Sequence, residues 1–364
     1  MILCVLATVL FSVGWFYFFY YFNPIKLTPS EPITAFPPVS IIISARNSVL
    51  KLENNIQHWL TQDYPNFEVV IIDDRSSDET AFFLVKTAEK EPLLKYVLLD
   101  PDVIKNGSKK LALTLGIKKA KNNYFLLTDA DCIPNSDQWL KHMATGFTNK
   151  KDIVLGVSPV NTKKSFLGRL TQYENLLTAM QYLGMSIKGK PYMGVGRNLS
   201  YRKALFEQNG GFGPHLNVLA GDDDLFVNRV ANPGNVAVCL DPESFTISIP
   251  KENWSDWVSQ KRRHFSVSAL YKQSDQFRLL ILNASRSLGW ILLPILFLLP
   301  GGLFPASFLL VLRFVLRIKP LKRVSLALRE EIWVLALPIL DFVHSIAVFA
   351  IAIQARFSER KTWM

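Results

Sequence analysis

From residue 39 onward, apolar runs of strand length alternate with helix-length segments of mixed character. The runs predict strands over residues 39–43, 67–72, 96–99 and 124–127. The stretches between them have helical periodicity, around residues 48–62, 78–90 and 109–121. This alternation is typical of an α/β fold with a mainly parallel sheet buried on both faces and flanking helices. Ligands of such sheets bind at the carboxyl ends of the strands.

A less regular block follows over residues 152–272. We expect a strand at Ile153–Val157, a helix from Ser165 to Gly184, and an acidic turn at Gly221-Asp222-Asp223-Asp224. We interpret this block as the second half of the same domain.

Long apolar segments lie near both ends of the chain. Residues 1–22 carry no charge, and about 20 apolar residues are enough to cross a bilayer. Because no positive residue precedes this segment and no small-residue cleavage site follows it, we expect a retained transmembrane anchor over residues 1–23 rather than a cleaved signal peptide. The prolines of residues 24–38 predict an extended linker.

Near the other end, three apolar segments are candidate spans or interfacial helices: 279–299, 303–316 and 331–354. Arg286, Asp341 and His344 lie within them, so part of this region is expected to be re-entrant or to face protein rather than lipid. The predicted organisation is a domain over residues 39–275 followed by transmembrane or interfacial helices over 279–355.

The formal net charge of +11 does not by itself indicate nucleic acid, because the cations are spread along the chain and many flank the apolar C-terminal part. We therefore expect a membrane partner and no nucleic acid. The basic segments after the anchor and around 313–329 favour a cytoplasmic position for the domain between the apolar segments. We expect a multi-pass protein of the inner (plasma) membrane. The three cysteines are too widely spaced for a disulfide framework or a zinc site.

Polar residues follow three of the predicted strands. They are Ser44-Ala45-Arg46-Asn47, Asp73-Asp74 with the residues up to Asp78, and Asp129-Ala130-Asp131. Because parallel strands end at one edge of a sheet, these loops should converge. Asp129 and Asp131 can reach a hard divalent cation that neutralises a diphosphate, although Asp-x-Asp also occurs in ordinary turns. Asp73-Asp74 can serve as a turn or can bind a base or ribose, and both interpretations can hold.

Two further clusters could carry chemistry. Asp222-Asp223-Asp224 precedes an apolar run, so these acids could cap a helix, or their mutual repulsion could raise a pKa and prepare a general base. Gln260-Lys261-Arg262-Arg263-His264 could hold a departing diphosphate or could form a solvated or membrane-facing basic helix.

Taken together, these residues resemble the family 2 glycosyltransferases of GT-A (Rossmann-like) fold, which include cellulose, chitin and hyaluronan synthases and bacterial glycolipid transferases. The resemblance covers roughly residues 38–270. It includes the opening strand with Ala45-Arg46-Asn47, the segment through Asp73-Asp74, and Lys109 on the helix before Asp129-Ala130-Asp131. Gly196-Arg197-Asn198 and Gly210-Gly211-Phe212 resemble the segments that line the acceptor side.

The resemblance implies a role for each matched residue. Asp74 would contact the nucleotide base, and Asp131 would contact Mg²⁺ or Mn²⁺ directly, with Asp129 nearby. The remaining nucleotide-sugar contacts would come from Ala45, Arg46, Asn47, Asp73, Lys109, Gln260, Arg262 and Arg263. The acceptor side would include Gly196, Arg197, Asn198 and His264.

Two departures from the family pattern affect the expected mechanism. The usual Glu-Asp pair is Asp-Asp in this chain, so the catalytic base is Asp223 or Asp222, with Asp223 preferred and Asp224 adjacent. The motif Gln-x-x-Arg-Trp of processive enzymes is carried by Gln260 and Arg263, but His264 replaces the tryptophan.

The expected activity is inverting transfer of a sugar from a nucleotide-diphosphate sugar, with a UDP-sugar favoured, to a lipid or glycan acceptor at the membrane. Such transfer belongs to polysaccharide or glycolipid biosynthesis. Two alternatives use the same sequence features: a metal-dependent phosphohydrolase, and a non-catalytic membrane scaffold that keeps the fold.

Overall fold

The computed structural model describes residues 2–22, 25, 36–100, 108–147, 151–218 and 220–357. The chain divides into two compact units. The sheet unit comprises Leu27–Asn161, Gly189–Ile249 and Lys361–Met364, and the helical unit comprises Met1–Lys26, Thr162–Lys188 and Pro250–Arg360. Most of the predicted linker lies outside the described residues, and the predicted domain boundaries stay a prediction.

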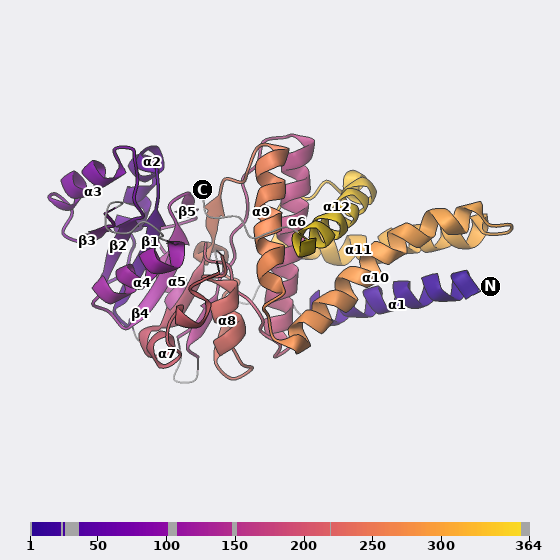
Figure 1. Cartoon of the computed structure of the whole chain (residues 1–364), viewed down its shortest axis with the longest axis horizontal. Helices are drawn as coiled ribbons and strands as arrows, with labels where there is room; N and C mark the ends of the chain where they lie inside the picture. The colour runs from indigo at the N-terminus through magenta and orange to yellow at the C-terminus, as the bar shows by residue number, and fades with distance from the viewer. Residues whose placement is uncertain are drawn as a thin grey trace. The chain divides into compact units, whose positions relative to one another are not determined.

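A mixed sheet of seven strands, in the order β3-β2-β1-β4-β7-β6-β8, forms the centre of the described sheet unit (Figure 1). Its strands are β1 (Val39–Ala45), β2 (Phe67–Asp73), β3 (Leu94–Leu98), β4 (Tyr124–Asp129), β6 (Ile153–Leu155), β7 (Leu199–Arg202) and β8 (Val236–Val238). β7 runs antiparallel to both of its neighbours, β4 and β6, and the other pairs are parallel. A separate antiparallel pair joins β5 (Cys132–Pro134) to β9 (Thr246–Ser248). The predicted mainly parallel α/β fold is confirmed.

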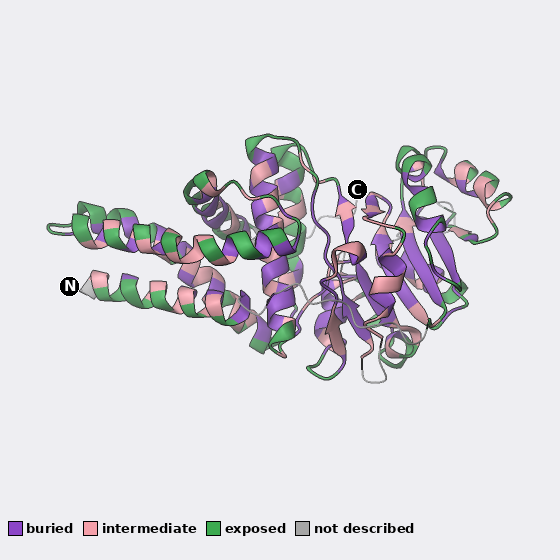
Figure 2. Cartoon of the chain, turned by 180° about the vertical axis from the view of Figure 1, so that it is seen from behind, coloured by how far each residue is buried: buried purple, intermediate pink, exposed green. Residues whose placement is uncertain are grey.

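The central strands are buried on both faces, as Figure 2 shows in purple. All seven residues of β2 are buried, which explains why residues 69–72 form an apolar run without alternation. The helices of this unit are α2 (Val49–Leu60), α3 (Thr80–Ala88), α4 (Lys109–Lys119), α5 (Trp139–Ala144), α7 (Lys203–Gln208) and α8 (Asp224–Val230). Gly116 lets α4 approach the sheet closely, because a Cβ at this position would lie 2.3 Å from Ile72 Cδ1.

The helical unit contains α1 (Ile2–Phe22), α6 (Phe166–Ile187), α9 (Trp254–Ser268), α10 (Gln273–Leu298), α11 (Leu303–Ala327) and α12 (Leu337–Phe357). Among the described residues, three helical segments are long and apolar enough to cross a membrane: Leu3–Phe22, Gln273–Leu298 and Val334–Gln354. α1 packs along α10, and α12 packs against α9. The apolar segments predicted near both ends of the chain are therefore helices.

The ionisable residues within the apolar helices contact protein. Asp341 and His344 are buried, and the Arg286 side chain is only 14% exposed and pairs with Asp341 at 2.7 Å. These contacts explain how polar side chains are accommodated in helices of this composition.

Candidate functional site

The carboxyl ends of β1, β2 and β4 lie side by side at one edge of the sheet. Ala45 is in register with Asp73, and Ser44 is in register with Asp129. The three polar loops that follow these strands therefore converge, as their positions after parallel strands predict.

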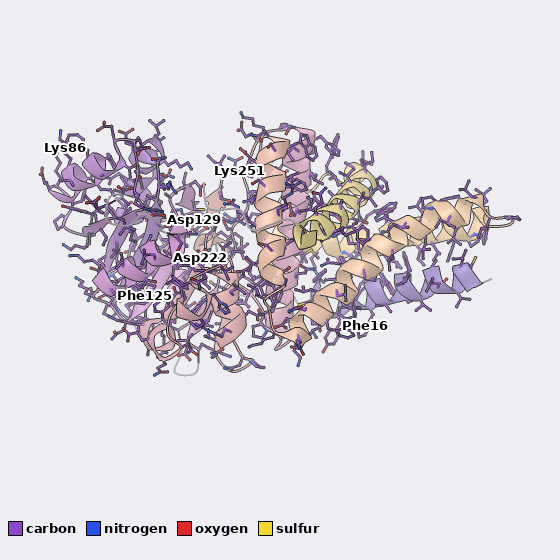
Figure 3. All side chains as sticks on the ribbon, in the orientation of Figure 1. Phe16, Lys86, Phe125, Asp129, Asp222 and Lys251 are labelled. Carbon is purple, nitrogen blue, oxygen red and sulfur yellow. The ribbon has the colours of Figure 1, made fainter. Side chains whose placement is uncertain are left out.

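Lys109, in the first turn of α4, joins two acidic clusters that are far apart in the sequence. Its Nζ lies 2.8 Å from Asp129 Oδ1 and 3.0 Å from Asp222 Oδ2. Figure 3 labels both carboxylates within the sheet unit. Burial alone would raise the pKa of Asp129, but the Lys109 ammonium holds it below the usual value. The ammonium thus keeps charged carboxylates together in a partly buried site.

Asp223 is the N-cap residue of α8, and its carboxylate is held by backbone amides. Gly196 N–H donates to Asp223 Oδ2 at 2.6 Å, and Asp224 N–H donates to Oδ1 at 2.8 Å. Burial and the neighbouring Asp222 charge raise the pKa of Asp223 to about 6. Asp223 is therefore suited to accept a proton near neutral pH, whereas Asp222 is engaged by Lys109.

Asp129, Asp131 and Cys132 each offer one potential ligand atom, and these atoms lie within 4.8 Å of one another. The carboxylate oxygens suit a hard cation such as Mg²⁺ or Mn²⁺. Cys132 does not suit one, because burial raises the pKa of its thiol well above the usual value. Lys51 Nζ lies 3.6 Å from Asp131 Oδ2, and the half-exposed Lys51 side chain can move aside. The two carboxylates of this group therefore fit a divalent cation.

The loops after β1 and β2 hold each other through side chains. Asn47 Oδ1 accepts a hydrogen bond from Ser77 N–H at 2.8 Å, and Asp73 accepts hydrogen bonds from the backbone and hydroxyl of Ser76. Arg75 Nε lies 2.8 Å from Asp74 Oδ1. Asn47 and Arg75 both have positive φ angles, of 46° and 57°. Residues with a left-handed backbone conformation are often found at binding sites.

Among the predicted acceptor-side residues, Asn198 is fully buried and links three segments of the sheet unit by hydrogen bonds. Its amide nitrogen donates to Val157 O and Ser244 O, both at 2.8 Å, and its Oδ1 accepts from Trp139 Nε1 at 3.1 Å. Arg197 Nη1 donates to Ser248 Oγ at 2.5 Å. Gly196 contacts Asp223 directly, so this segment supports the acidic cluster from one side.

Gln260, Arg262, Arg263 and His264 lie on α9 of the helical unit, and Arg262, Arg263 and His264 are exposed there. Arg262 Nη2 donates to Gln354 Oε1 at 2.8 Å. Lys261, from the same motif, pairs with Glu174 at 2.6 Å. The expected roles of the α9 residues in binding a diphosphate and an acceptor stay predictions.

Two basic residues of this site were not predicted from the sequence. Arg75 covers Asp74, and Lys51 faces Asp131 from α2. The Lys51 position could have been found from its place in the first turn of the helix that follows β1, at the same edge as the acids. The left-handed conformation of Arg75 has no sequence signal, because glycine and asparagine are the residues that usually adopt it.

Comparison with known proteins shows which proteins this fold and site resemble. Residues 40–210 match the model of the family Glycosyl transferase family 2. The fold is GT-A-like. The mannosyltransferase PcManGT from Pyrobaculum calidifontis, solved in complex with GDP-Man and Mn²⁺, superposes with a TM-score of 0.66 at 19% identity, over 98% of this chain and 99% of that one.

Curated relatives include the probable glycosyltransferase YdaM of Bacillus subtilis (strain 168), 26% identical over 64% of this chain and 56% of the relative. The poly-beta-1,6-N-acetyl-D-glucosamine synthase of Staphylococcus aureus (strain COL) is 28% identical over 47% of this chain and 41% of the relative. The chain thus spans about half the length of these relatives.

Proposed function

We propose that this protein is an inverting, metal-dependent glycosyltransferase that moves a sugar from a nucleotide-diphosphate sugar to a lipid or glycan acceptor at the membrane. One observation carries the proposal. The Lys109 side chain pairs with both Asp129 and Asp222, and Asp223 directly follows Asp222 in the chain. Asp129 also belongs to the group of potential cation ligands with Asp131. Acids suited to a divalent cation and a carboxylate with a raised pKa therefore lie close together, which supports a transfer from a diphosphate donor.

In the proposed reaction, Asp223 removes the proton of an acceptor hydroxyl. The hydroxyl oxygen forms a bond to the anomeric carbon while the bond from that carbon to the diphosphate oxygen breaks, so the configuration inverts. Asp131 and Asp129 would hold Mg²⁺ or Mn²⁺, which when bound would neutralise charge on the diphosphate. Lys109 supplies a fixed positive charge beside the same acids and helps to hold the Asp222–Asp224 turn in place.

The donor end of the site is proposed at the loops after β1 and β2, where Asp74 would bind the base and Asn47 and Asp73 support the loop. A UDP-sugar is favoured by the family resemblance. PcManGT was solved with GDP-Man, so a GDP-sugar is the second donor to test. We place the protein in the inner (plasma) membrane as a multi-pass protein with its sheet unit in the cytoplasm, on the basis of its apolar helices and basic loops.

Membranes containing the protein, incubated with a panel of radiolabelled UDP- and GDP-sugars, test this proposal. We expect one donor to label a lipid or polymer product with Mn²⁺ or Mg²⁺ present, and EDTA to abolish the labelling. Membranes that carry Asp131→Asn in place of the wild-type residue serve as the matched control. Hydrolysis of the donor at a rate independent of any acceptor would instead support the phosphohydrolase, and failure of every donor to react would support the non-catalytic scaffold.

A further inference from the structure

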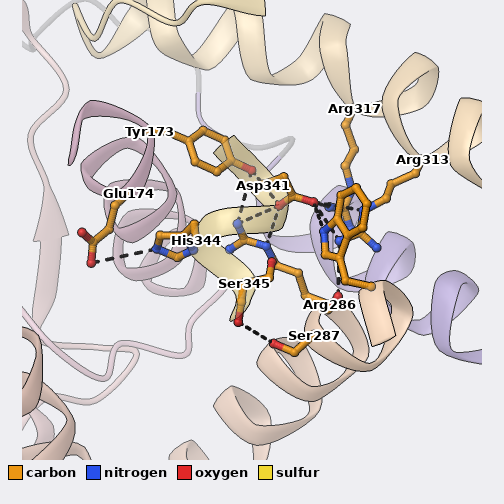
Figure 4. A network of polar contacts seen from close by, with 10 residues as sticks. Tyr173, Glu174, Arg286, Ser287, Arg313, Arg317, Asp341, His344 and Ser345 are labelled. Atoms are coloured by element: carbon orange, nitrogen blue, oxygen red, sulfur yellow. Dashed lines mark hydrogen bonds and ion pairs between the residues drawn. The ribbon is translucent and has the colours of Figure 1, made fainter. Parts of the chain in front are cut away.

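The Asp341 carboxylate on α12 is the centre of a polar network in the helical unit (Figure 4). Its Oδ1 accepts hydrogen bonds from Arg286 Nε at 2.7 Å and from the Tyr173 hydroxyl at 2.8 Å. Its Oδ2 accepts from Arg313 Nη2 at 2.8 Å and from Trp290 Nε1 at 2.9 Å. Both carboxylate oxygens are therefore well supplied with donors, and the charge of Asp341 is shared between two guanidinium groups.

A third guanidinium, that of Arg317 on α11, has no comparable partner. Its Nη1 lies 3.9 Å from Asp341 Oδ2, beyond hydrogen-bond distance. Its Nε is buried and makes no hydrogen bond to any residue in the described part of the chain. Three guanidinium groups around one carboxylate leave an excess of two positive charges (3 − 1 = 2). A buried cation is costly without an opposing charge, so this network favours binding of a further anion.

The neighbouring carboxylate Glu174 has partners of its own. Lys261 Nζ lies 2.6 Å from Glu174 Oε1, and Trp257 Nε1 donates to Oε2 at 3.0 Å. The positive charge of Lys261 balances that of Glu174, so this pair does not reduce the excess around Asp341.

A cavity adjoins the Arg317 guanidinium. Arg286, Arg317, Asn283 and Gln181 contribute polar side chains to its lining, and aromatic rings of α1, including Phe18 and Phe22, form part of its apolar wall. The volume of the cavity is about 30 Å³, and the cavity is partly open to the outside. The cavity therefore combines cationic and amide groups with apolar surface.

We propose that this cavity binds a phosphate monoester carried on a hydrocarbon chain. Arginine pairs bidentately with phosphate oxygens, and a phosphate monoester carries about two negative charges near pH 7, which matches the excess in the network. The hydrocarbon chain would lie along the apolar wall between helices whose composition suits a membrane. The proposal concerns the helical unit alone and does not depend on the function proposed for the sheet unit.

Native mass spectrometry of the purified full-length protein in detergent tests this inference with dioleoyl phosphatidic acid as the probe. We expect wild-type protein to retain phosphatidic acid in preference to phosphatidylglycerol, a diester with one charge, and to neutral phosphatidylcholine. Arg317→Gln should weaken retention of phosphatidic acid by about tenfold, the effect of losing one charge-assisted hydrogen bond. Arg323→Gln is the matched control, because Arg323 is exposed on the same helix and does not line the cavity.

Thermal unfolding separates ligand binding from a structural role of Arg317. Without lipid, Arg317→Gln should melt at or above the wild-type temperature, because it removes a poorly paired buried cation. Phosphatidic acid should then raise the melting temperature of wild-type protein more than that of the variant. If Arg317→Gln fails to fold, Asn283→Leu, which removes a polar lining group and keeps every charge, should still weaken retention.

Three results would overturn the inference. The first is equal retention of phosphatidic acid by wild-type, Arg317→Gln and Asn283→Leu proteins. The second is equal retention of phosphatidic acid and phosphatidylcholine. The third is stabilisation by inorganic phosphate as large as that by phosphatidic acid, which would show that the hydrocarbon chain contributes nothing.

Discussion

Replacing Lys109 with methionine should destabilise the sheet unit in a pH-dependent way. The change keeps an apolar side chain of similar length but removes the ammonium that lies 2.8 Å from Asp129 and 3.0 Å from Asp222. The Lys109 side chain is 22% exposed and that of Asp222 11% exposed, so solvent screens these pairs only in part. Removing one partner of a buried pair typically costs about 3–5 kcal/mol, and we expect about 3 kcal/mol at pH 8.

The sign of the pH dependence follows from the pKa values of the acids. In the wild-type protein, Lys109 lowers the folded-state pKa of Asp129. The Lys109–Asp129 pair therefore stabilises the fold fully above the pKa that Asp129 has in the unfolded chain. This stabilisation is lost only as pH falls through the lower pKa that Asp129 has in the folded state. In Lys109→Met, burial and mutual repulsion should raise the folded-state pKa values of the acids above their unfolded values. Stability of the variant is then lost as pH rises, so the difference from wild type should grow between pH 5 and pH 8.

The buried cysteines provide an assay confined to the sheet unit. Cys132 and Cys239 are free and buried there, so their labelling by a thiol reagent, measured by mass spectrometry in EDTA, reports opening of this unit. A loss of about 3 kcal/mol should speed labelling by about 100-fold at pH 8 relative to wild type at the same pH. Lys51→Met is the control, because Lys51 is 52% exposed and its pair with Asp131 should contribute under about 1 kcal/mol.

Labelling of Lys109→Met at the wild-type rate at pH 8 would refute this account of the Lys109 bridge. An acceleration equal at pH 5 and pH 8 would refute its electrostatic origin, because loss of packing alone does not depend on the ionisation of the acids.

The remaining predictions concern the proton acceptor, the cation and the segment beside them. Because the pKa of Asp223 is about 6, kcat/KM should fall about tenfold per pH unit below pH 6 and stay constant above it. A pH–rate profile in which this fall begins only near pH 4 would contradict the assignment of Asp223 as the proton acceptor. Mn²⁺ should raise the melting temperature of wild-type and Cys132→Ser protein but not that of Asp131→Asn, as measured by calorimetry. The reverse result would assign the cation to the Cys132 thiol. Asn198→Ala should lower the free energy of unfolding by about 2–4 kcal/mol, because two buried carbonyls lose their donors, and wild-type stability in a denaturant titration would show that these hydrogen bonds contribute little.

Much of the sheet could be predicted because strands buried on both faces leave a strong signal. The runs that form β1, β2 and β4 are almost continuously apolar, and the polar residues after them mark the binding edge. β7 was not predicted, because Leu199–Arg202 is short and half polar, and its antiparallel insertion between β4 and β6 depends on long-range pairing. Local patterns carry no information about which strand will accept such a neighbour.

The candidate site could be predicted as a set of acids but not as a network. The sequence places Asp129 and Asp222 on separate loops, and nothing local indicates that one lysine bridges them. The helical unit shows the same limit. Charged residues within apolar helices predict polar partners, yet the pairing of Tyr173 on α6 with Asp341 on α12 joins positions 168 residues apart and follows only from the packing of whole helices.

Sugar transfer by an Asp223→Asn variant tests the central claim most directly. Nucleotide-sugar binding by calorimetry and transfer by radiolabelled product would be measured side by side, with Asp222→Asn for comparison. The asparagine cannot take the acceptor proton, so we expect transfer to fall by about 10²–10⁴-fold while binding of the donor stays close to wild type. Wild-type transfer by Asp223→Asn would contradict the assignment of the base, and loss only in Asp222→Asn would move the base by one residue.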